Sequence, residues 1–549
     1  MLLAQMNMIR KYYGDRLILK VDDFKLYKND RIGIVGVNGS GKTTFLNILT
    51  NKTMPDEGTA KIFGTYSYIT QLGTYFDYIE KGDIDGYAAS RLGVNNLGSE
   101  GLSGGEITRL KIARALSKDN ALIIADEPTS NLDSEGIELL QNEMKNFNGA
   151  ILVVSHDREF LDEVCNSILE IENGEIRLYK GNYSKYKELK EQERKRALFE
   201  YEQYKAEKSR LEMVIEEKKH KVASIKRPPK RMGNSEARLH KMGGQSEKAK
   251  LDRQINAIRT RIEKLEVKEK PRELPQVNVD LQKMGQLHCK VVFSSDKLNK
   301  SFGDKIIFED AKFKIYNNSK TAIIGPNGSG KTTLVRMIVN GDPAIQRAIG
   351  VKIGYFSQDI SILEDNMTLL QNVMKDSLYD EAFVRTLLAR LLFKREDLMK
   401  DVSLLSGGEK VKAALAKIIV SDFNVLVLDE PTNYLDIYSM EAVEEALLNY
   451  TGTVIFISHD RRFVSNVADH IISIENCRTV CFDGALEEYK EQKRKKEALT
   501  QQSDKPYDKM LLQTRLAEIL GRLSMPSKGD NVEELDREYK EILEKLKRL

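Results

Sequence analysis

The chain has 549 residues, a length that predicts roughly three or four compact units, since one domain holds about 100–200 residues. Hydrophobic residues make up 41% and charged residues 31%, with a net charge of +3, which is typical of a soluble globular protein. No apolar run approaches the roughly 18–20 residues that cross a bilayer, and the opening MLLAQMNMIRKYYG lacks a secretory signal pattern. The four cysteines are scattered and fit neither a disulfide framework nor a metal site. We therefore expect a cytoplasmic protein with reduced thiols.

The first predicted unit, residues 1–184, contains a phosphate-binding loop. The apolar run Ile32–Val35 precedes GVNGSGKTT at 36–44, and a helical pattern begins near Lys42. Glycines in such a loop let backbone N–H groups approach phosphate oxygens, and the helix N-terminus adds a positive dipole end. This setting predicts that Lys42 pairs with the β- and γ-phosphates of a nucleotide and that Thr43 supplies a hydroxyl to Mg²⁺.

Two further strands of this unit end in candidate catalytic residues. The run ALIIADEP at 121–128 ends in two acids, of which Asp126 fits a water-mediated Mg²⁺ contact and Glu127 the base that orients an attacking water. The run AILVVSH at 150–156 places His156 where a neutral imidazole can reach the γ-phosphate. A lone histidine of this kind is more often a core residue, but the same setting occurs twice in this chain.

Residues 185–272 have a different character. They are nearly all Lys, Arg, Glu, Gln and Leu, a composition with high helix propensity. In the second half, apolar residues recur at steps of four and three, at Leu251, Ile255, Ile258, Ile262 and Leu265. In the first half, a similar stripe is formed by Tyr204, Leu211, Ile215 and Val222. Pro228–Pro229 and Gly243–Gly244 are expected to interrupt the helices. The pattern predicts an antiparallel helical hairpin rather than a floppy charged linker.

The tip of this hairpin, about residues 218–250, is basic. It contains eleven Lys or Arg against two acids, Glu236 and Glu247. Such a tip suits a phosphate backbone, with steep salt dependence, and its lack of aromatic residues argues against base-specific readout. A solvated basic loop is the alternative, which the position between two helices disfavours. The candidate RNA-binding residues are Lys226, Arg227, Lys230, Arg231, Arg238 and Lys241.

Residues 285–490 repeat the first unit. GPNGSGKTT at 325–333 follows the first loop at an offset of 289, whereas LSGGE at 102–106 recurs at 405–409 with an offset of 303. From Gln358 to Ser406 there are 48 residues, against 32 from Gln71 to Ser103, so the second copy carries 16 more there. By the same reasoning as before, the functional candidates of this copy are Lys331, Thr332, Asp429, Glu430 and His459.

The C-terminal residues 497–549 predict a second, smaller α-hairpin. Leu512, Leu516, Ile519 and Leu523 form one seam, and MPSKGDN at 525–531 provides a turn. The second seam consists of Leu535, Tyr539, Ile542, Leu546 and Leu549.

The order of these motifs, which covers most of the chain, resembles the ATP-binding-cassette (ABC) ATPase superfamily. The resemblance implies an α/β protein with two ABC-type P-loop ATPase domains joined by an α-helical hairpin linker, with a C-terminal α-helical extension. The two domains would pair head to tail, with each ATP between the phosphate loop of one and the LSGGE of the other. ATP on Lys42 would then be closed by Ser406, Gly407 and Gly408, and ATP on Lys331 by Ser103, Gly104 and Gly105.

The resemblance also implies the remaining contacts to two ATP molecules and their Mg²⁺ ions. Tyr13 and Phe302 would stack on adenine, and in the first copy Tyr12 could take the place of Tyr13. Mg²⁺ would be bound by Thr43, Gln71, Thr332 and Gln358. Further nucleotide contacts would come from Gly36, Asn38, Gly39, Ser40, Gly41, Thr44, Asp126, Gly325, Asn327, Gly328, Ser329, Gly330, Thr333 and Asp429. The residues after the acids differ, Ser130-Asn131 against Asn433-Tyr434, which makes unequal sites an open possibility without indicating the slower one.

The attached segments distinguish three tasks for such an ATPase. A transporter ATPase docks on membrane subunits between its glutamine and LSGGE, and the 32 residues from Gln71 to Ser103 leave little room for that. DNA-repair relatives carry zinc modules or very long coiled coils, which this sequence lacks. Two fused cassettes with a charged helical linker instead resemble the ABC-F family, whose members act on the ribosome.

The ABC-F resemblance extends through the linker. RPPKRMGNSEARLHKM at 227–242 is similar to the tips of the antibiotic-resistance branch, of the Vga, Lsa and VmlR type. That branch implies a monomer whose ATP-closed form enters the E site of the 70S ribosome and contacts 23S rRNA and P-site tRNA. It would dislodge lincosamides, streptogramins A and pleuromutilins from the peptidyl-transferase centre. A housekeeping ABC-F factor acting on stalled ribosomes is the alternative, and a transporter ATPase is a more distant one.

Neutralising Lys226, Arg227, Lys230 and Arg231 to Gln should weaken ribosome binding and leave nucleotide binding intact. The slope of log affinity against log salt should fall by about 0.7–0.9 for each phosphate group that the tip no longer neutralises. Co-sedimentation with ribosomes over a series of KCl concentrations measures both effects. Unchanged binding at every salt concentration would remove the basic tip from the interface.

Overall fold

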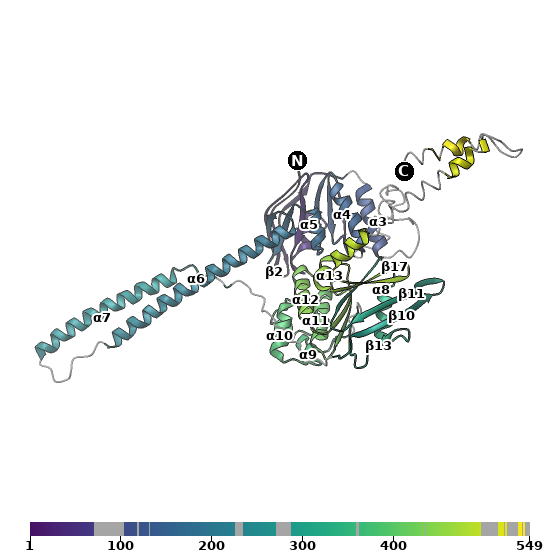
Figure 1. The fold of residues 1–549 in the computed structure, drawn as a ribbon. Helices are drawn as coiled ribbons and strands as arrows, with labels where there is room; N and C mark the ends of the chain where they lie inside the picture. The colour runs from purple at the N-terminus through teal and green to yellow at the C-terminus, as the bar shows by residue number, and fades with distance from the viewer. Residues whose placement is uncertain are drawn as a thin grey trace. The chain divides into compact units, whose positions relative to one another are not determined.

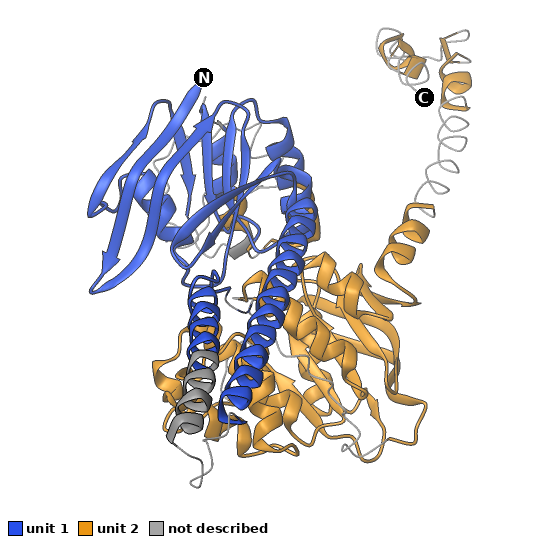
Figure 2. Ribbon diagram, turned by 90° about the vertical axis from the view of Figure 1, so that its left-hand side faces the viewer, with its two compact units in different colours: residues 1–97, 110–129, 140–276 blue, residues 98–109, 130–139, 277–549 orange. Residues whose placement is uncertain are grey.

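The computed structural model describes residues 1–70, 104–117, 120–130, 132–224, 234–268, 270, 287–357, 362–433, 435–495, 514–520, 522–523, 536–540 and 542–543. The chain forms two compact units (Figure 2). Unit 1 comprises residues 1–97, 110–129 and 140–276, and unit 2 comprises residues 98–109, 130–139 and 277–549. Unit 2 therefore takes in two short segments of the first sequence copy. The domain boundaries predicted from the sequence divide the chain differently and stay predictions.

Unit 1 is built on a nine-stranded sheet. Its strands are β1 (Leu2–Tyr13), β2 (Arg16–Tyr27), β3 (Arg31–Val35), β4 (Glu57–Ile62), β5 (Tyr66–Ile69), β6 (Leu122–Asp126), β7 (Ala150–Val154), β8 (Ser167–Glu172) and β9 (Glu175–Lys180). The strand order is β4-β1-β2-β9-β8-β3-β7-β6-β5. The segment β8-β3-β7-β6-β5 is parallel, and β1 pairs antiparallel with both β2 and β4. A buried parallel segment of this kind is typical of α/β proteins, whose helices cover the sheet.

The core of unit 1 forms where α1 (Lys42–Leu49) packs on the sheet. Phe45 on α1 meets Phe24 on β2 edge to face, with ring centroids 5.2 Å apart. Strands β3, β6 and β7 contribute fully buried aliphatic residues to the same cluster. The remaining helices are α3 (Gly104–Ser117) and α4 (Ser134–Asn146), each of which begins in unit 2, and α5 (Arg158–Val164), α6 (Tyr183–Ser224) and α7 (Asn234–Glu263).

Helices α6 and α7 run side by side as a long hairpin (Figure 1). Leu211, Ile215 and Ile255 are buried between them, as the apolar seam predicts. Polar pairs fix the antiparallel register: Arg261 contacts Glu207 at 3.2 Å, and Lys218 Nζ donates to Gln254 Oε1 at 2.7 Å.

One expectation about this hairpin is wrong. Gly243–Gly244 do not interrupt the helix, because α7 runs without a break from Asn234 to Glu263. Each glycine costs about 1 kcal/mol against alanine in a helix, and the flanking turns rich in helix formers outweigh that cost. The Pro228–Pro229 pair lies outside the described residues.

A buried ionic cluster anchors the base of α6 to the sheet. The carboxylate of Glu170 on β8 accepts hydrogen bonds from Tyr186 Oη at 2.7 Å and Lys190 Nζ at 2.6 Å. In the second copy, Glu475 accepts from Lys493 Nζ at 2.7 Å. Because Glu170 is almost fully buried, removing the Lys190 ammonium would leave a costly unpaired charge, so the base of the hairpin is held to the ATPase sheet.

Unit 2 repeats the same strand plan. Its strands are β10 (Val291–Phe302), β11 (Lys305–Tyr316), β12 (Lys320–Ile324), β13 (Gln346–Arg347), β14 (Ile353–Phe356), β15 (Val425–Asp429), β16 (Thr453–Ile457), β17 (His470–Glu475) and β18 (Arg478–Asp483). A six-stranded sheet has the order β14-β15-β16-β12-β17-β18, and a three-stranded sheet has the order β11-β10-β13. The order β14-β15-β16-β12-β17 matches β5-β6-β7-β3-β8 of unit 1, which confirms that the two copies share one fold.

The helices of unit 2 include those formed by the extra residues that the second copy has between Gln358 and Ser406. They are α8 (Lys331–Asn340), α9 (Leu369–Met374), α10 (Glu381–Arg390), α11 (Gly407–Val420), α12 (Ile437–Asn449) and α13 (Arg461–Val467), with the short 3₁₀ helices η2 (Asp397–Met399) and η3 (Val402–Leu404). Helices α9 and α10 pack on α11. The extra residues before the second LSGGE therefore form a small helical layer against the helix that this motif begins.

In the C-terminal segment, residues 514–520 and 536–540 are helical. Ile519 and Ile542 are buried against each other, with Leu516, Leu523 and Tyr539 packed around them. Arg515 and Glu538 form an ion pair at 3.2 Å between the two helical pieces. These contacts agree with the two seams predicted from the sequence.

The prediction of an α/β fold with two cassette domains, a helical hairpin and a C-terminal helical extension is confirmed. Within the described ranges, no helix combines the length and the apolar character needed to cross a bilayer.

Replacing the buried seam residue Leu211 by Ala should loosen the hairpin. Losing a buried leucine costs about 2–5 kcal/mol in a closed core, and less here because the hairpin is only two helices thick. Hydrogen exchange of the amides in α6 and α7 should accelerate, while exchange in β3, β6 and β7 should not change. Met213→Ala, on the exposed face of the same helix, is the matched control. Equal exchange in the two variants would contradict a packed hairpin.

Candidate active sites

The strand order brings the three candidate motifs of each copy to one edge of the sheet. In unit 1, β7 lies between β3 and β6. The phosphate loop follows β3, the paired acids end β6, and His156 follows β7. Because these strands are parallel, their carboxyl ends meet at the same edge, which is where open α/β sheets bind ligands. In unit 2, β12, β16 and β15 repeat this arrangement.

Each phosphate loop wraps around its own lysine. Lys42 Nζ donates a hydrogen bond to the carbonyl of Gly36 at 2.8 Å, and Lys331 Nζ donates to that of Gly325 at 2.8 Å. The loop residue before each lysine is a glycine with positive φ, 102° in the first loop and 103° in the second, which side chains rarely tolerate. The loop thus curls so that the lysine lies at the start of the helix.

The loops fit a phosphate group. The hydroxyl oxygens of Ser40 and Ser329 are buried and have no hydrogen-bond partner within the described chain. A buried hydroxyl without a partner is costly unless a ligand supplies one. Together with the ammonium groups and the helix N-termini of α1 and α8, these oxygens mark a place for an anion in each loop.

A hydroxyl and a carboxylate stand together beside each loop. Thr43 Oγ1 donates to Asp126 Oδ2 at 3.0 Å, and Thr332 Oγ1 donates to Asp429 Oδ1 at 3.4 Å. Mg²⁺ in nucleotide sites takes one or two protein oxygens, and phosphates and waters complete its shell. This donor set fits Mg²⁺. No group of three or more His, Cys, Asp and Glu side chains that could form a complete protein cage exists in the parts of the chain that the structure describes.

The second acid of each pair contacts the histidine of the same copy. Glu127 Oε1 lies 3.4 Å from His156 Nε2, and Glu430 Oε1 lies 3.2 Å from His459 Nε2. Both carboxylates are nearly buried, with 11% and 8% of their side chains exposed. A carboxylate and an imidazole therefore share one small space at the end of the phosphate loop.

Short hydroxyl contacts hold each histidine-bearing turn. Ser155 Oγ and Thr129 Oγ1 lie 3.1 Å apart, and Ser458 Oγ and Thr432 Oγ1 lie 3.0 Å apart. In each pair, the serine precedes the histidine and the threonine follows the acids, so a hydroxyl contact joins the segments that carry the two candidate groups. Asp157 and Asp460 cap the helices that follow.

Burial changes the protonation of these groups. It raises the pKa of Glu127, and it raises the pKa of Glu430 to about 7, although Lys42 and Lys331 oppose the change. Burial lowers the pKa of His459 to about 4, with Lys331 adding to the effect. The imidazole of His459 is therefore neutral at physiological pH, whereas Glu430 titrates near neutrality before a nucleotide binds.

The backbone at both acids is unusual. Glu127 has φ of 51° and Glu430 has φ of 53°, in the left-handed region that residues other than glycine rarely adopt. Such conformations cost on the order of 1–3 kcal/mol and cluster at functional sites. The two residues with this backbone are the same ones whose carboxylates lie beside His156 and His459.

The LSGGE motif of the second copy begins a capped helix. Ser406 is the N-cap of α11, and a reciprocal pair of hydrogen bonds with Glu409 closes a capping box. Ser406 and Gly407 are exposed at this positive helix end, and the Ser406 hydroxyl donates to Glu409 Oε2 at 2.7 Å. In the first copy, α3 begins at Gly104.

The two candidate adenine-stacking residues occupy equivalent places. Tyr13 ends β1 and Phe302 ends β10, and both rings are more than half exposed. Lys11 Nζ lies 5.7 Å from the centre of the Tyr13 ring, and Lys300 Nζ lies 6.0 Å from that of Phe302. The competing residue Tyr12 is also exposed.

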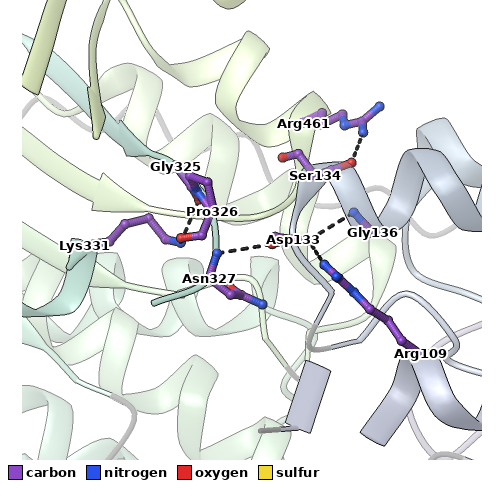
Figure 3. A network of polar contacts seen from close by, with 9 residues as sticks. All are labelled: Arg109, Asp133, Ser134, Gly136, Gly325, Pro326, Asn327, Lys331 and Arg461. Carbon is purple, nitrogen blue, oxygen red and sulfur yellow. Dashed lines mark hydrogen bonds and ion pairs between the residues drawn. The ribbon is translucent and has the colours of Figure 1, made fainter. Parts of the chain in front are cut away.

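The structure adds contacts that the sequence does not predict (Figure 3). Asp133 Oδ2 accepts the backbone N–H of Asn327 at 3.2 Å, which connects the first copy to the second phosphate loop within unit 2. Arg109 binds the same carboxylate at 2.8 Å. Arg461 Nη2 donates to the carbonyl of Ser134 and contacts Glu138 at 3.0 Å. The offset of 303 pairs Asp133 with Asp436, but nothing in a single sequence indicates what either aspartate contacts.

Several predicted site residues lie outside the described residues. These are Gln71, Gln358, Ser103, Lys226, Arg227, Lys230 and Arg231. Arg238 and Lys241 lie within the helical backbone of α7, and their side chains are not described.

Comparison with known proteins shows similarity along almost the whole chain. A family model described as "ABC transporter" matches residues 19–82, 77–130 and 308–433. The chain is 33% identical over 468 residues to the erythromycin resistance ATP-binding protein MsrA of Staphylococcus epidermidis, covering 84% of this chain and 96% of that protein. It is 30% identical over 552 residues to the ribosome protection protein VmlR of Bacillus subtilis (strain 168), covering 97% and 96%.

Two further similarities concern the family and the fold. The chain is 30% identical over 563 residues to ABC transporter F family member 5 of Arabidopsis thaliana, covering 88% of this chain and 76% of that protein. Its fold is similar to a solved structure of an RNase-L inhibitor, with a TM-score of 0.58, 20% identity, and coverage of 88% and 91%.

Glu430→Gln should stabilise the nucleotide-free protein more at pH 8.5 than at pH 5. The folded pKa of Glu430 is raised from 4.5 to about 7, so the folded state binds an extra proton between these values. The wild type therefore loses stability as pH rises through this window, and glutamine, which cannot ionise, does not. We expect a relative gain of about 1–3 kcal/mol at the higher pH.

Thermal unfolding followed at the two pH values measures this difference. Glu396→Gln, which removes an exposed carboxylate from the same copy, should change the melting temperature little at either pH. A Glu430→Gln effect of equal size at both pH values would show that burial does not perturb this carboxylate.

Proposed function

Because the chain belongs to the ABC-F family and is an ATP-hydrolysing enzyme, we propose that it protects the ribosome from antibiotics. In this proposal the ATP-closed form binds the E site, contacts P-site tRNA through the linker tip, and dislodges drugs from the peptidyl-transferase centre. The observation that carries the proposal is the similarity to a ribosome protection protein over 97% of this chain, a span that includes the linker as well as both cassettes.

The chemistry proposed for each cassette follows from its geometry. Lys42 and Lys331 bind the β- and γ-phosphates. The buried hydroxyls of Ser40 and Ser329 form their hydrogen bonds with the same phosphates. Mg²⁺, held by Thr43 with Asp126 and by Thr332 with Asp429, would neutralise charge on the phosphates. The glutamines Gln71 and Gln358 would complete this site.

Glu127 and Glu430 are the proposed bases that orient the attacking water. Each carboxylate lies within 3.4 Å of an imidazole nitrogen of His156 or His459, so the neutral imidazole can donate toward the γ-phosphate while the carboxylate accepts from water. Binding of Mg²⁺ brings positive charge to the edge of the site, which favours the ionised carboxylate. The base would thus become active once its substrate is present.

Closure is proposed to use the LSGGE motifs across the two cassettes. Ser406, Gly407 and Gly408 offer a hydroxyl and N–H groups at a capped helix end, which suits the γ-phosphate of ATP on Lys42. The corresponding residues Ser103, Gly104 and Gly105 would close ATP on Lys331. Hydrolysis breaks the bond between the γ-phosphate and the rest of the nucleotide. It would therefore let the two cassettes separate and the protein leave the ribosome.

The helical hairpin supports a reach into the ribosome. Helix α6 has 42 residues, which corresponds to about 63 Å at 1.5 Å per residue. Its base is fixed to the ATPase sheet by Glu170 with Tyr186 and Lys190, so movement of the cassette would be carried along the arm. The basic tip would then meet the phosphate backbone of tRNA and 23S rRNA, with the protein acting as a monomer on cytoplasmic 70S ribosomes.

The drug classes implied by the resemblance are lincosamides, streptogramins A and pleuromutilins. The similarity to an erythromycin resistance protein adds erythromycin as a compound to test. A housekeeping ABC-F factor that acts on stalled ribosomes would share the ATPase and the ribosome contacts, and it would differ in giving no drug tolerance.

Expressing the protein in a drug-susceptible bacterium should raise the minimal inhibitory concentration of at least one of these drugs by several doublings. Glu127→Gln with Glu430→Gln should abolish the effect, because the protein cannot release itself after closure. Replacing Pro228, Pro229 and Met232 should reduce protection more than ribosome co-sedimentation, if the shape of the tip displaces the drug.

The contrary outcome is a protein that binds ribosomes in an ATP-dependent manner yet leaves every inhibitory concentration unchanged. That result would favour the housekeeping function. Equal loss of ribosome binding and protection in the tip variant would make the tip an anchor only.

A further inference from the structure

Asp56, the residue before β4, is bonded to the end of β1. Its Oδ2 accepts the backbone N–H of Tyr12 at 2.7 Å, and its Oδ1 lies 3.0 Å from Lys11 Nζ. The backbone N–H of Asp56 in turn donates to the carbonyl of Arg10 at 2.9 Å. One residue therefore makes polar contacts with three successive residues of β1, just before the turn that leads into β2.

These contacts prolong the pairing of β1 with β4. The last backbone pair of the two strands is Arg10 with Glu57. Beyond it, the carboxylate of Asp56 takes the place of a main-chain carbonyl as the acceptor for the Tyr12 N–H. The Tyr12 N–H and the Lys11 ammonium hold the pKa of Asp56 below its usual range, so the carboxylate is ionised at physiological pH. An ionised acceptor makes a stronger hydrogen bond than a neutral one.

The alternation of side chains along β1 places Tyr12 and Tyr13 on opposite faces of the sheet. Ile9 is fully buried in the core cluster to which α1 contributes. Lys11 and Tyr13 follow Ile9 at steps of two, so they lie on the face that α1 covers. The Lys11 ammonium is 5.7 Å from the centre of the Tyr13 ring, which agrees with this placement. Tyr12 lies on the other face.

The end of the β1–β2 ribbon lies beside the first phosphate loop. The pairing of the two strands skips one residue of β2, Ile18. This residue approaches the loop, because a Cβ at Gly41 would lie 3.2 Å from the Ile18 carbonyl oxygen and 3.4 Å from its Cγ2. The Tyr13 ring is thus placed to receive the base of a nucleotide whose phosphates occupy the loop around Lys42.

The second copy contains the same kind of arrangement. Lys300 Nζ lies 6.0 Å from the centre of the Phe302 ring and 3.9 Å from Asp342 Oδ2. Lys300 and Phe302 correspond to Lys11 and Tyr13 at the offset of 289. In both copies, a carboxylate from the segment between the phosphate-loop helix and the next strand holds a lysine beside the candidate adenine-stacking ring. This recurrence argues for a role in nucleotide binding.

We propose that Asp56 is a positioning residue for the adenine ring of the nucleotide bound at Lys42. By holding the Tyr12 N–H and the Lys11 ammonium, it fixes the end of β1 so that Tyr13, and not Tyr12, stacks on the base. Because more than half of Tyr13 is exposed, packing in the core does not fix the ring, and these polar contacts do. The inference rests on the proposed stacking role and names the residue on which that role depends.

Binding of ADP to the full-length protein tests the proposal without closure or hydrolysis. Lys331→Ala weakens the second loop, so that calorimetric titration reports the site of Lys42. Two substitutions are introduced into this background: Asp56→Ala, which loses both side-chain contacts, and Asp56→Asn, which keeps an acceptor and loses the charge. Glu57→Ala removes the neighbouring exposed carboxylate and is the matched control.

The two tyrosines are compared first. Tyr13→Ala should weaken ADP binding about tenfold, because base–aromatic stacking is lost. Tyr12→Ala keeps the backbone N–H that Asp56 accepts, so it should change the dissociation constant by less than about twofold.

Asp56→Ala should weaken ADP binding about fivefold and Asp56→Asn about threefold, whereas Glu57→Ala should match its parent. In a protein that also carries Tyr13→Ala, the Asp56 substitutions should have no further effect, because Asp56 acts through the ring. A merely structural role would lower the affinity by the same factor with and without the ring. If Asp56→Ala does not fold, Asp56→Asn carries the same comparison.

Three results would overturn the proposal. They are unchanged ADP binding in the Asp56 variants, an equal loss with and without the Tyr13 ring, and a loss in Tyr12→Ala as large as that in Tyr13→Ala. Unchanged binding in Tyr13→Ala would instead show that the proposed stacking itself fails, and the proposal would fall with it. A failure of ribosome protection is distinguishable from all of these, because ADP binding is measured without ribosomes or drugs.

Discussion

Each catalytic centre depends on two neighbouring carboxylates at the end of a buried strand. Burial raises the pKa of all four acids, Asp126 and Glu127 in one copy and Asp429 and Glu430 in the other. Two neighbouring negative charges that are buried away from water raise the free energy of the folded state, and this cost falls only when cations lie beside them. Much of the local structure serves this need, from the lysine of the phosphate loop to the Mg²⁺ that the acids and threonines can hold.

The parallel strand order follows from the same constraint. The loop lysine, the acids and the histidine come from distant parts of the sequence, and the order β6-β7-β3 or β15-β16-β12 places them side by side at one sheet edge. Glu127 and Glu430 have a left-handed backbone, and the carboxylate of each lies beside the histidine of its copy. A neutral imidazole and a carboxylate that ionises near neutrality form a pair suited to handling a water beside a phosphate.

The sequence predicted those parts of the structure that repeat or have periodic patterns. The strands before GxNGSGKT, DEP and SH were expected, because the apolar run before each of these motifs is short and bounded. The hairpin seam of Leu211, Ile215 and Ile255 was expected from its heptad steps. The helical continuity through Gly243–Gly244 was missed, since a local penalty of about 1 kcal/mol per glycine is small beside a helix of 30 residues. The contacts of Asp133 with Asn327 and of Arg461 with Ser134 were missed for a different reason: they join residues 194 and 327 positions apart in the chain, and neither periodicity nor motif spacing encodes such a contact.

The measurement that tests the account most directly uses the Glu127→Gln, Glu430→Gln variant, which should bind ATP and barely hydrolyse it. Cell lysate containing this protein is centrifuged through a sucrose cushion with ATP or with ADP. The account predicts that the protein sediments with 70S ribosomes in ATP and stays in the supernatant in ADP. Recovery with membranes, or sedimentation that does not depend on the nucleotide, would contradict it.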